Sequence, residues 1–302
     1  MPPDERIITV HPVKIWLLAS RPKTLAAGLT PVLIGSAMAA SAGGFHALAA
    51  VSAALGALLI QIGTNFANDY FDYVKGTDTE ERVGPTRATQ AGLVSPKTML
   101  FATILVFALS FVPGAYLIFR GGWPFLAIGI VSVICGVLYT GGPYPLGYLG
   151  LGDLFVLVFF GPVAVGGTYY VQTLTLSSDV LVAGLIPGLF STAILTVNNL
   201  RDADTDVKTG KKTLAVRFGK PFARLEYLFC LLVAGIALPI YLCLKSGENN
   251  AALIALAAML LAIPMVKKVF NSNDGEVLNG VLAGTGKLLL IFSILFSIGW
   301  LW

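Results

Sequence analysis

The chain has 302 residues, of which 56% are hydrophobic and 12% are charged, and its formal net charge is +4. Because about a quarter of the residues of a soluble domain are charged, this composition excludes a soluble globular protein and indicates a membrane protein. The basic residues do not form a stripe interleaved with stacking aromatic side chains, so we expect no nucleic-acid partner.

Nine apolar stretches follow one another along the chain, and each approaches the length of about 20 residues that a helix needs to cross a bilayer. The run over residues 98–119 is apolar on every face and lacks the two-residue alternation of a membrane barrel strand. We therefore predict an all-α membrane protein with a single transmembrane domain over residues 1–302, in which residues 1–12 form a polar tail. The predicted spans are residues 13–40, 47–72, 97–119, 123–140, 151–172, 180–202, 222–244, 250–269 and 276–301.

Lys and Arg residues lie mainly in alternate loops. With the N-terminus in the cytoplasm, the basic loops 73–97 and 203–224 are cytoplasmic, whereas the opposite side keeps only Arg120 and Lys245. Cytoplasmic loops of membrane proteins are enriched in Lys and Arg. We therefore expect a cytoplasmic N-terminus and, because the number of spans is odd, a C-terminus on the opposite side.

The second apolar stretch ends in a polar sequence, NFANDYFDYVKGTD, over residues 65–78. On a helix, residues three, four and seven positions apart share one face. Four polar side chains therefore lie on one predicted stripe: Asn65, Asn68, Asp69 and Asp72. Asp78 is expected in the loop after Gly76.

The sixth stretch ends in a second polar sequence, NNLRDADTD, over residues 198–206. Asn198, Asp202 and Asp206 are spaced by four residues, so they also lie on one helical stripe. Asn198 and Asp202 each follow their counterparts in the first cluster by 130 positions. This is a weak internal repeat, which Asp78 and Asp206 do not follow.

Carboxylates near a bilayer cost free energy unless they face a cavity, pair with a cationic group or bind a cation. Helix caps and surface ion pairs explain one such cluster, but two clusters with the same Asn-x₃-Asp spacing favour a shared ligand. Carboxylate and amide oxygens suit Mg²⁺, which usually completes its coordination with water and substrate phosphate oxygens. The two stripes therefore predict a site for a diphosphate bridged by Mg²⁺.

Basic residues follow both clusters and are suited to neutralising a departing diphosphate. The alternative for each is a loop charge that only sets the membrane orientation. They are Lys75, Arg82, Arg87, Lys208, Lys211 and Lys212. With only His11 and His46 as histidines, the chain offers no Ser/His/Asp or Cys/His nucleophile system. The chemistry indicated is ionisation of an allylic diphosphate assisted by metal.

Four sequence blocks carry a family resemblance: residues 20–35 (SRPKTLAAGLTPVLIG), 68–92 (NDYFDYVKGTDTEERVGPTRATQAG), 139–156 (YTGGPYPLGYLGLGDLFV) and 198–219 (NNLRDADTDVKTGKKTLAVRFG). In this order they resemble the UbiA superfamily of intramembrane prenyltransferases. Within it they are most similar to the 1,4-dihydroxy-2-naphthoate polyprenyltransferases of menaquinone and phylloquinone synthesis. The likeness covers nearly the whole chain.

The resemblance implies a bundle of nine helices around a central cavity under a cytoplasmic cap, in a bacterial inner membrane. It implies two Mg²⁺ ions bridging the diphosphate, with ligands at Asn68, Asp72, Asp78, Asn198, Asp202 and Asp206. Diphosphate contacts are implied at Lys75, Arg82, Arg87 and Lys212. Asp72 and Asp202, together with Tyr139, are the expected catalytic residues. Further candidates for the site are Arg21, Asn65, Asp69, Asn199, Asp153 and Lys211.

The first motif distinguishes branches of the superfamily. The hydroxybenzoate branch requires an acid at position 76, whereas this chain has Gly76 and places the acid at Asp78, as the naphthoate branch does. The resemblance therefore implies transfer of a prenyl chain from a polyprenyl diphosphate to 1,4-dihydroxy-2-naphthoate, with loss of CO₂ and a demethylmenaquinone-type product. The alternatives are another aromatic acceptor, hydroxybenzoate or homogentisate, and a secondary transporter, which would carry its charges near the bilayer centre.

Four residues have two interpretations each. Arg21 is either a site residue or an interfacial arginine. Asp153 either caps the fifth span or forms a polar wall of the acceptor site. Tyr139 either stabilises a carbocation with its ring or belongs to the interfacial aromatic belt. Lys287, deep in the last span, is expected to face the bundle interior in a structural or cavity role.

Overall fold

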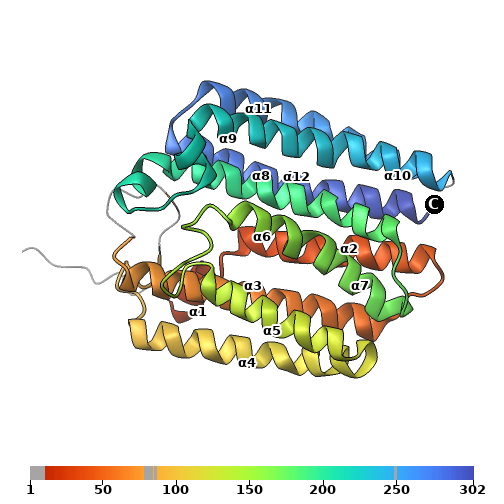
Figure 1. Ribbon diagram of the computed structural model, residues 1–302, viewed down its shortest axis with the longest axis horizontal. Helices are drawn as coiled ribbons and strands as arrows, with labels where there is room; N and C mark the ends of the chain where they lie inside the picture. Colours follow the sequence, from red (N-terminus) through yellow and green to blue (C-terminus); the bar gives the residue numbers. More distant parts are fainter. Residues whose placement is uncertain (1–10, 78–83, 85–86, 248–249) are drawn as a thin grey trace, which may run out of the picture.

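The computed structural model describes residues 11–77, 84, 87–247 and 250–302, and these residues form helices and loops without any strand. The long helices run side by side, with α8 and α12 between an upper group (α9–α11) and a lower group (α2–α7) in Figure 1. The elements are α1 (Pro12–Ser20), α2 (Pro22–Ser41), α3 (Ala47–Val74), α4 (Pro96–Gly121), α5 (Trp123–Leu138), α6 (Gly152–Val158), η1 (Phe159–Val163), α7 (Ala164–Thr173), α8 (Ser178–Lys208), α9 (Leu214–Leu232), η2 (Val233–Ala237), α10 (Leu238–Ser246), η3 (Asn250–Leu261), α11 (Ala262–Asn271) and α12 (Gly275–Trp300).

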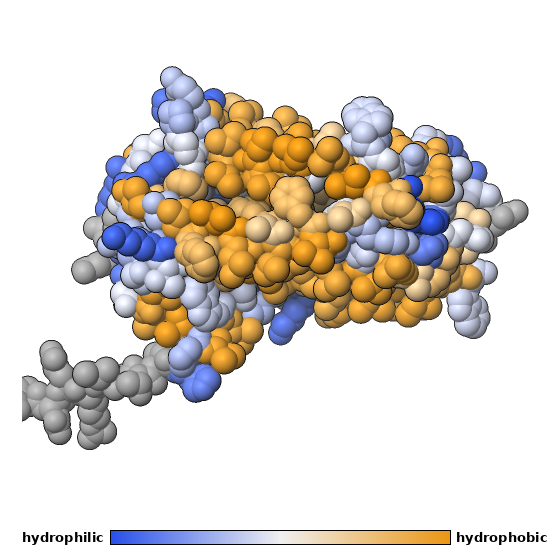
Figure 2. Space-filling view, turned by 90° about the horizontal axis from the view of Figure 1, so that it is seen from below, coloured by the Kyte–Doolittle hydropathy of each residue, from blue (hydrophilic) through white to orange (hydrophobic). Residues whose placement is uncertain are grey.

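The outer surface has the character of a membrane protein. Eight helical stretches of the described chain are long and apolar enough to cross a membrane, and α5, with 16 residues, is a shorter apolar helix. Figure 2 shows a broad hydrophobic surface over the middle of the molecule, with hydrophilic side chains gathered toward its two ends. The all-α membrane class predicted from the sequence is therefore confirmed, and the protein is an integral membrane protein.

The first predicted span is not one helix. The chain breaks at Arg21, whose φ of 51° lies in the left-handed region, so that α1 and α2 are separate. The cause lies next to it, because Pro22 has no backbone N–H and disfavours the helical conformation of the residue before it. The predicted span over residues 13–40 therefore consists of two helices, α1 and α2, and not of one.

Two other helix ends differ from the prediction in ways that affect the site. α8 continues to Lys208, six residues beyond the predicted end of the span at residue 202, and it carries Asp206 on the helix as the predicted stripe requires. α9 begins at Leu214 instead of residue 222, and it contains a break at Gly219, where φ is 85°. Both segments contain charged residues. The predicted spans were bounded by apolar length, so one ended too early and the other began too late.

α6, η1 and α7 form one crossing that bends at Gly161, and α8 packs directly against the bend. A Cβ atom on Gly161 would lie 2.9 Å from the carbonyl oxygen of Gly184, and one on Gly188 would lie 2.6 Å from that of Leu157. The two backbones approach this closely only because glycine carries no side chain. This contact holds the crossing formed by α6, η1 and α7 against the buried helix α8.

Lys287 does not face the interior as predicted. It lies in the middle of α12, on the exposed stripe that includes Leu290 and Ile294, whereas Leu288 and Phe292 on the opposite face are buried in the core. One helical residue turns the side chain by about 100°, so a lysine beside a core position points outward. The expectation of an interior role was therefore wrong.

Candidate active site

A cavity of about 490 Å³ lies inside the helix bundle. At one end it is lined by polar residues from the ends of α3 and α8, including Asn68, Asp72, Asn198 and Asp202. Beyond them the lining is mostly apolar or glycine and is supplied by α2, α3, α4, α5 and the α6–α7 crossing. The sequence-predicted stripes thus face one shared cavity that has a polar head and an apolar body.

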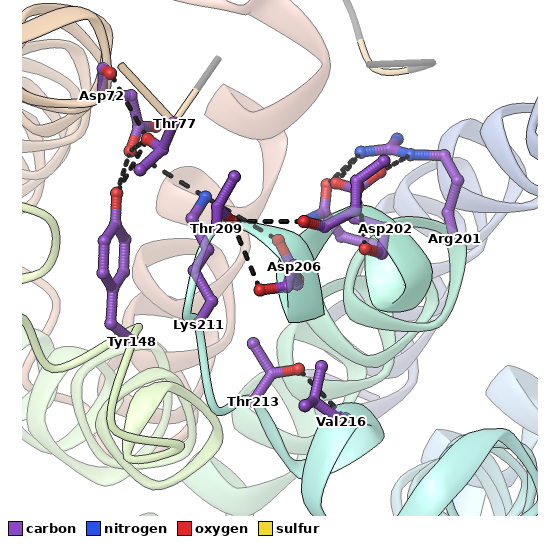
Figure 3. Close-up of polar contacts among 12 residues, drawn as sticks. Asp72, Thr77, Tyr148, Arg201, Asp202, Asp206, Thr209, Lys211, Thr213 and Val216 are labelled. Carbon is purple, nitrogen blue, oxygen red and sulfur yellow. Dashed lines mark hydrogen bonds and ion pairs between the residues drawn. The ribbon is translucent and has the colours of Figure 1, made fainter. Parts of the chain in front are cut away.

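Asp72 is the centre of the polar end on α3, and it is only 1% exposed. Arg87 donates from Nη2 to Asp72 Oδ2 at 2.6 Å, and the Tyr148 hydroxyl donates to Oδ1 at 2.7 Å. The hydroxyl of Thr77 lies 3.2 Å from the same Oδ1, and the Lys211 ammonium lies 4.0 Å away. The groups around this carboxylate come from three different loops, which therefore converge on the end of α3 (Figure 3).

The other polar residues of this stripe have different surroundings. The Oδ1 atom of Asn68, a residue that lines the cavity, accepts a hydrogen bond from the Thr140 hydroxyl at 2.9 Å. Asn65 donates to the carbonyl of Ser20 at 2.9 Å and so ties α3 to the α1–α2 break. Asp69 does not line the cavity. Its two oxygens accept the backbone N–H groups of residues 88 and 89 at 2.9 and 3.0 Å. It anchors the loop that carries Arg87.

On α8, the second stripe is held by Arg201, whose side chain is 1% exposed. Its guanidinium donates to both oxygens of Asp202 at 2.7 and 2.6 Å. It also donates to Asn198 Oδ1 at 2.8 Å and to Asn279 Oδ1, on α12, at 2.6 Å. Asp206, one turn further along α8, has the Lys211 ammonium 3.8 Å away. Asn199 is buried and also lines the cavity.

Lys211 connects the two stripes. Its ammonium lies within 4.0 Å of a carboxylate from each stripe and 4.8 Å from the centre of the Tyr148 ring (Figure 3). The neighbouring Lys212 does not line the cavity, and its backbone N–H donates to the Tyr148 carbonyl at 2.8 Å. The base that reaches both carboxylates is therefore Lys211.

Lys75 lies just outside the cavity lining. Its ammonium donates to the carbonyls of Thr140 and Gly142 at 2.6 and 3.0 Å and lies 5.0 Å from the Tyr148 ring centre. Desolvation lowers the pKa of Lys75, an effect that the nearby Asp72 charge opposes. Lys75 thus fixes the loop that begins at residue 139.

Arg21 and Tyr139 both line the cavity, Arg21 at the break between α1 and α2 and Tyr139 directly after α5. Asp153 lies in the first turn of α6 but does not cap it, because its carboxylate makes no hydrogen bond to another residue. The capping prediction was wrong, since the carboxyl group points into the protein. Asp78 and Arg82 lie outside the described residues.

Sequence reasoning missed several contacts of the site. Tyr148 and Thr77 bond Asp72, and Asn279 bonds Arg201, although none was a candidate. Asn279 carried a usable signal, since an amide within an apolar span is expected to find a polar partner. Tyr148 carried none, because only the loop conformation brings it to α3.

The donor set fits a cation that is shared with a phosphate ligand. Within the described part of the chain, no three Asp, Glu, His or Cys side chains come together closely enough to hold a metal ion. The lining instead offers carboxylate and amide oxygens spread over two facing helices. Mg²⁺ is typically held in this way, by one or two carboxylates plus substrate phosphates and water. Cationic side chains beside each carboxylate suit a polyanionic ligand.

Comparison with known proteins agrees with this geometry. The chain is 39% identical over 295 residues to 1,4-dihydroxy-2-naphthoate octaprenyltransferase of Haemophilus influenzae, covering 95% of this chain and 96% of that protein. It is 37% identical over 293 residues to the enzyme of the same name from Escherichia coli, covering 94% of both. The fold is similar to that of a UbiA homolog from Archaeoglobus fulgidus solved with GPP and Mg²⁺, with a TM-score of 0.62, 16% sequence identity and coverage of 94% and 99%.

The family match extends over most of the helices that build the cavity. Residues 28–294 match the UbiA prenyltransferase family, and this range includes α3 and α8 with both polar stripes. The chain therefore belongs to the UbiA prenyltransferase family.

Proposed function

We propose that the protein transfers a prenyl chain from a polyprenyl diphosphate to 1,4-dihydroxy-2-naphthoate, with loss of CO₂, and forms a demethylmenaquinone-type product. The observation that carries this proposal is the pair of acidic stripes, each with cationic partners, at the head of a cavity whose body is apolar. The head is suited to a diphosphate and the body to a hydrocarbon chain. The names of the relatives at 37–39% identity support the naphthoate acceptor.

We assign two Mg²⁺ ions to the oxygens of Asn68, Asp72, Asp78, Asn198, Asp202 and Asp206. When bound, Mg²⁺ would stabilise the charge that develops on the diphosphate as the allylic C–O bond breaks. Arg87 and Lys211 line the cavity and are the first proposed diphosphate contacts. Lys75, Arg82 and Lys212 are proposed contacts from the adjoining loops. Arg21, Asn65 and Asn199 complete the proposed polar lining, and Asp69 positions the Arg87 loop.

The side chains of the chain itself prepare this site. Asp72 and Asp202 are each neutralised by an arginine at 2.6 Å, so neither carboxylate is left as an uncompensated charge before the ligand arrives. Tyr139 lines the cavity, where its ring is placed to stabilise an allylic cation. The apolar body excludes water from that cation, which would otherwise be captured as an alcohol.

We propose nine membrane spans, with α5 as the shortest. Its 16 residues are about 24 Å long at 1.5 Å per residue, close to the hydrocarbon thickness of about 30 Å. The loops around Tyr148 and Lys211 form a cap over the polar end, which we place on the cytoplasmic side of a bacterial inner membrane. The excess of Lys and Arg in these loops supports this orientation.

Purified protein tests the proposal when it is supplied with an allylic diphosphate, an aromatic acceptor and either Mg²⁺ or EDTA. We expect CO₂ release and prenylated naphthoquinol with 1,4-dihydroxy-2-naphthoate only in the presence of metal, and little product with 4-hydroxybenzoate. Asp72→Ala and Asp202→Ala should abolish turnover, whereas Asp204→Ala should keep it, because the Asp204 side chain is 80% exposed and paired with Lys220. Full activity in EDTA, or preference for hydroxybenzoate, contradicts the proposal.

A further inference from the structure

Asp153 differs from the other aspartates of the described chain. It is 7% exposed, and both of its carboxylate oxygens are buried without a hydrogen bond to another residue. Each of the others is paired with a cationic side chain or accepts backbone N–H groups, as Asp72 and Asp69 do. A buried carboxyl group without a partner costs free energy. The unsatisfied oxygens of Asp153 therefore indicate a role that uses their hydrogen-bonding capacity.

Three groups of the described structure interact electrostatically with Asp153, and none of them is a Lys or Arg side chain. These groups are Tyr139, Glu226 on α9 and the thiol of Cys230. Glu226 lies next to the hydroxyl of Thr196 on α8. Neither Asp153 nor Glu226 lines the central cavity. The carboxyl group of Asp153 therefore does not touch a substrate held in the cavity.

Tyr139 lines the cavity and is close enough to Asp153 to feel its charge. Its hydroxyl oxygen packs so closely against Gly152 that a Cβ atom there would be 3.0 Å from it. Burial raises the pKa of Tyr139, and the negative charges of Asp153, Asp72 and Asp206 raise it further. A phenol both accepts and donates a hydrogen bond. The Tyr139 hydroxyl makes no hydrogen bond to Asp153 in this structure, so proton transfer between them requires rotation of one side chain or a bridging water molecule.

We propose that Asp153 accepts a proton from a ring hydroxyl of the acceptor, through the hydroxyl of Tyr139, and returns it within the same turnover. This inference rests on the proposed function, because it needs a hydroxynaphthoate as the acceptor. Tyr139 is the catalytic residue of the pair. Asp153 is a positioning residue that acts through it.

The chemistry balances without any co-reactant. The allylic C–O bond breaks, and its electron pair leaves with the diphosphate. The ring carbon that bears the carboxylate forms the new C–C bond, and the adjacent hydroxyl loses its proton and becomes a ketone. The resulting β-keto carboxylate loses CO₂, and the electron pair of the broken C–C bond moves onto the ring oxygen. That oxygen recovers the proton, so the net reaction consumes and releases none.

The test crosses two variants with two acceptors. The variants are Asp153→Asn and Tyr139→Phe. The acceptors are 1,4-dihydroxy-2-naphthoate and its methyl ether at the hydroxyl next to the carboxylate-bearing carbon, which has no proton to give. With the free hydroxyl we expect kcat to fall by about 10²- to 10⁴-fold in each variant, the usual contribution of positioned acid–base groups. With the ether we expect a slow wild type and no further loss in either variant.

Further measurements separate this role from a structural one. Asp153→Asn should keep the wild-type KM for the prenyl diphosphate and the wild-type thermal stabilisation by Mg²⁺ with a prenyl thiolodiphosphate. Asp153→Glu should recover part of kcat, and the exposed Asp204→Asn is the matched carboxylate-to-amide control. If Asp153→Asn does not fold, Tyr139→Phe, which keeps the ring, carries the same test.

Two results would overturn the inference while leaving the proposed function intact. One is a wild-type kcat in both variants with the free hydroxyl. The other is an equal loss with both acceptors, which would mean that the variants damage the site and not the proton transfer. A wild-type enzyme that does not prenylate the naphthoate at all would overturn the proposed function and this inference together.

Discussion

Arg201→Met is expected to destabilise the protein strongly at the polar end of the cavity. The variant removes four hydrogen bonds and leaves Asp202, whose side chain is 11% exposed, as a buried charge without its partner. Breaking a buried ion pair in this way costs about 3–5 kcal/mol. Lys220→Met is the matched control on the same side of the molecule, because the Lys220–Asp204 pair at 2.7 Å is exposed and such pairs contribute about 0–1 kcal/mol.

The measurement is unfolding of the purified protein in mixed micelles with increasing SDS, without metal and followed by circular dichroism. We expect the free energy of unfolding to fall much more for Arg201→Met than for Lys220→Met. The double variant Arg201→Met/Asp202→Asn should recover much of the loss, because it removes the unpaired charge. Equal effects of the two single variants would refute the reasoning, since the buried pair would then contribute no more than the exposed one.

Two further changes test the packing around the site. Asp69→Asn leaves the backbone N–H group of either Ala88 or Thr89 without its acceptor. We expect the free energy of unfolding in SDS to fall by about 1–3 kcal/mol and proteolysis of the Arg87 loop to become faster. An unchanged cleavage rate would contradict this prediction. Gly114→Leu should shorten the preferred prenyl chain in a competition assay, because Gly114 lines the cavity with no atom within 4 Å of an added Cβ.

Much of the fold could be predicted because a membrane helix is marked by apolar length alone. The second predicted span, residues 47–72, differs from α3 (Ala47–Val74) by two residues. The stripe of Asn198, Asp202 and Asp206 follows from helical periodicity, and α8 carries all three residues. Apolar length did not locate the break at Arg21, where a left-handed backbone conformation separates α1 from α2.

The contacts within the site could not be predicted, because they depend on loop conformation. Lys211 and Lys212 are adjacent and chemically alike, and only the turn after α8 decides that the first of them reaches both carboxylates. Likewise, Tyr148 bonds Asp72 across 76 positions of sequence. Sequence spacing carries information about faces of one helix. It carries none about which loop residue meets which helix.

Arg87, Arg201 and Lys211 have a consequence for how the donor and the metal ion bind together. Each carboxylate that lines the cavity in the described structure has a cationic side chain within 4.0 Å: Arg87 for Asp72, Arg201 for Asp202 and Lys211 for Asp206. At this end of the cavity the charges of these side chains therefore balance one another. A metal ion or a diphosphate arriving alone would upset that balance, whereas their complex is nearly neutral. Donor and metal should thus each raise the affinity of the protein for the other, as thermodynamic linkage requires.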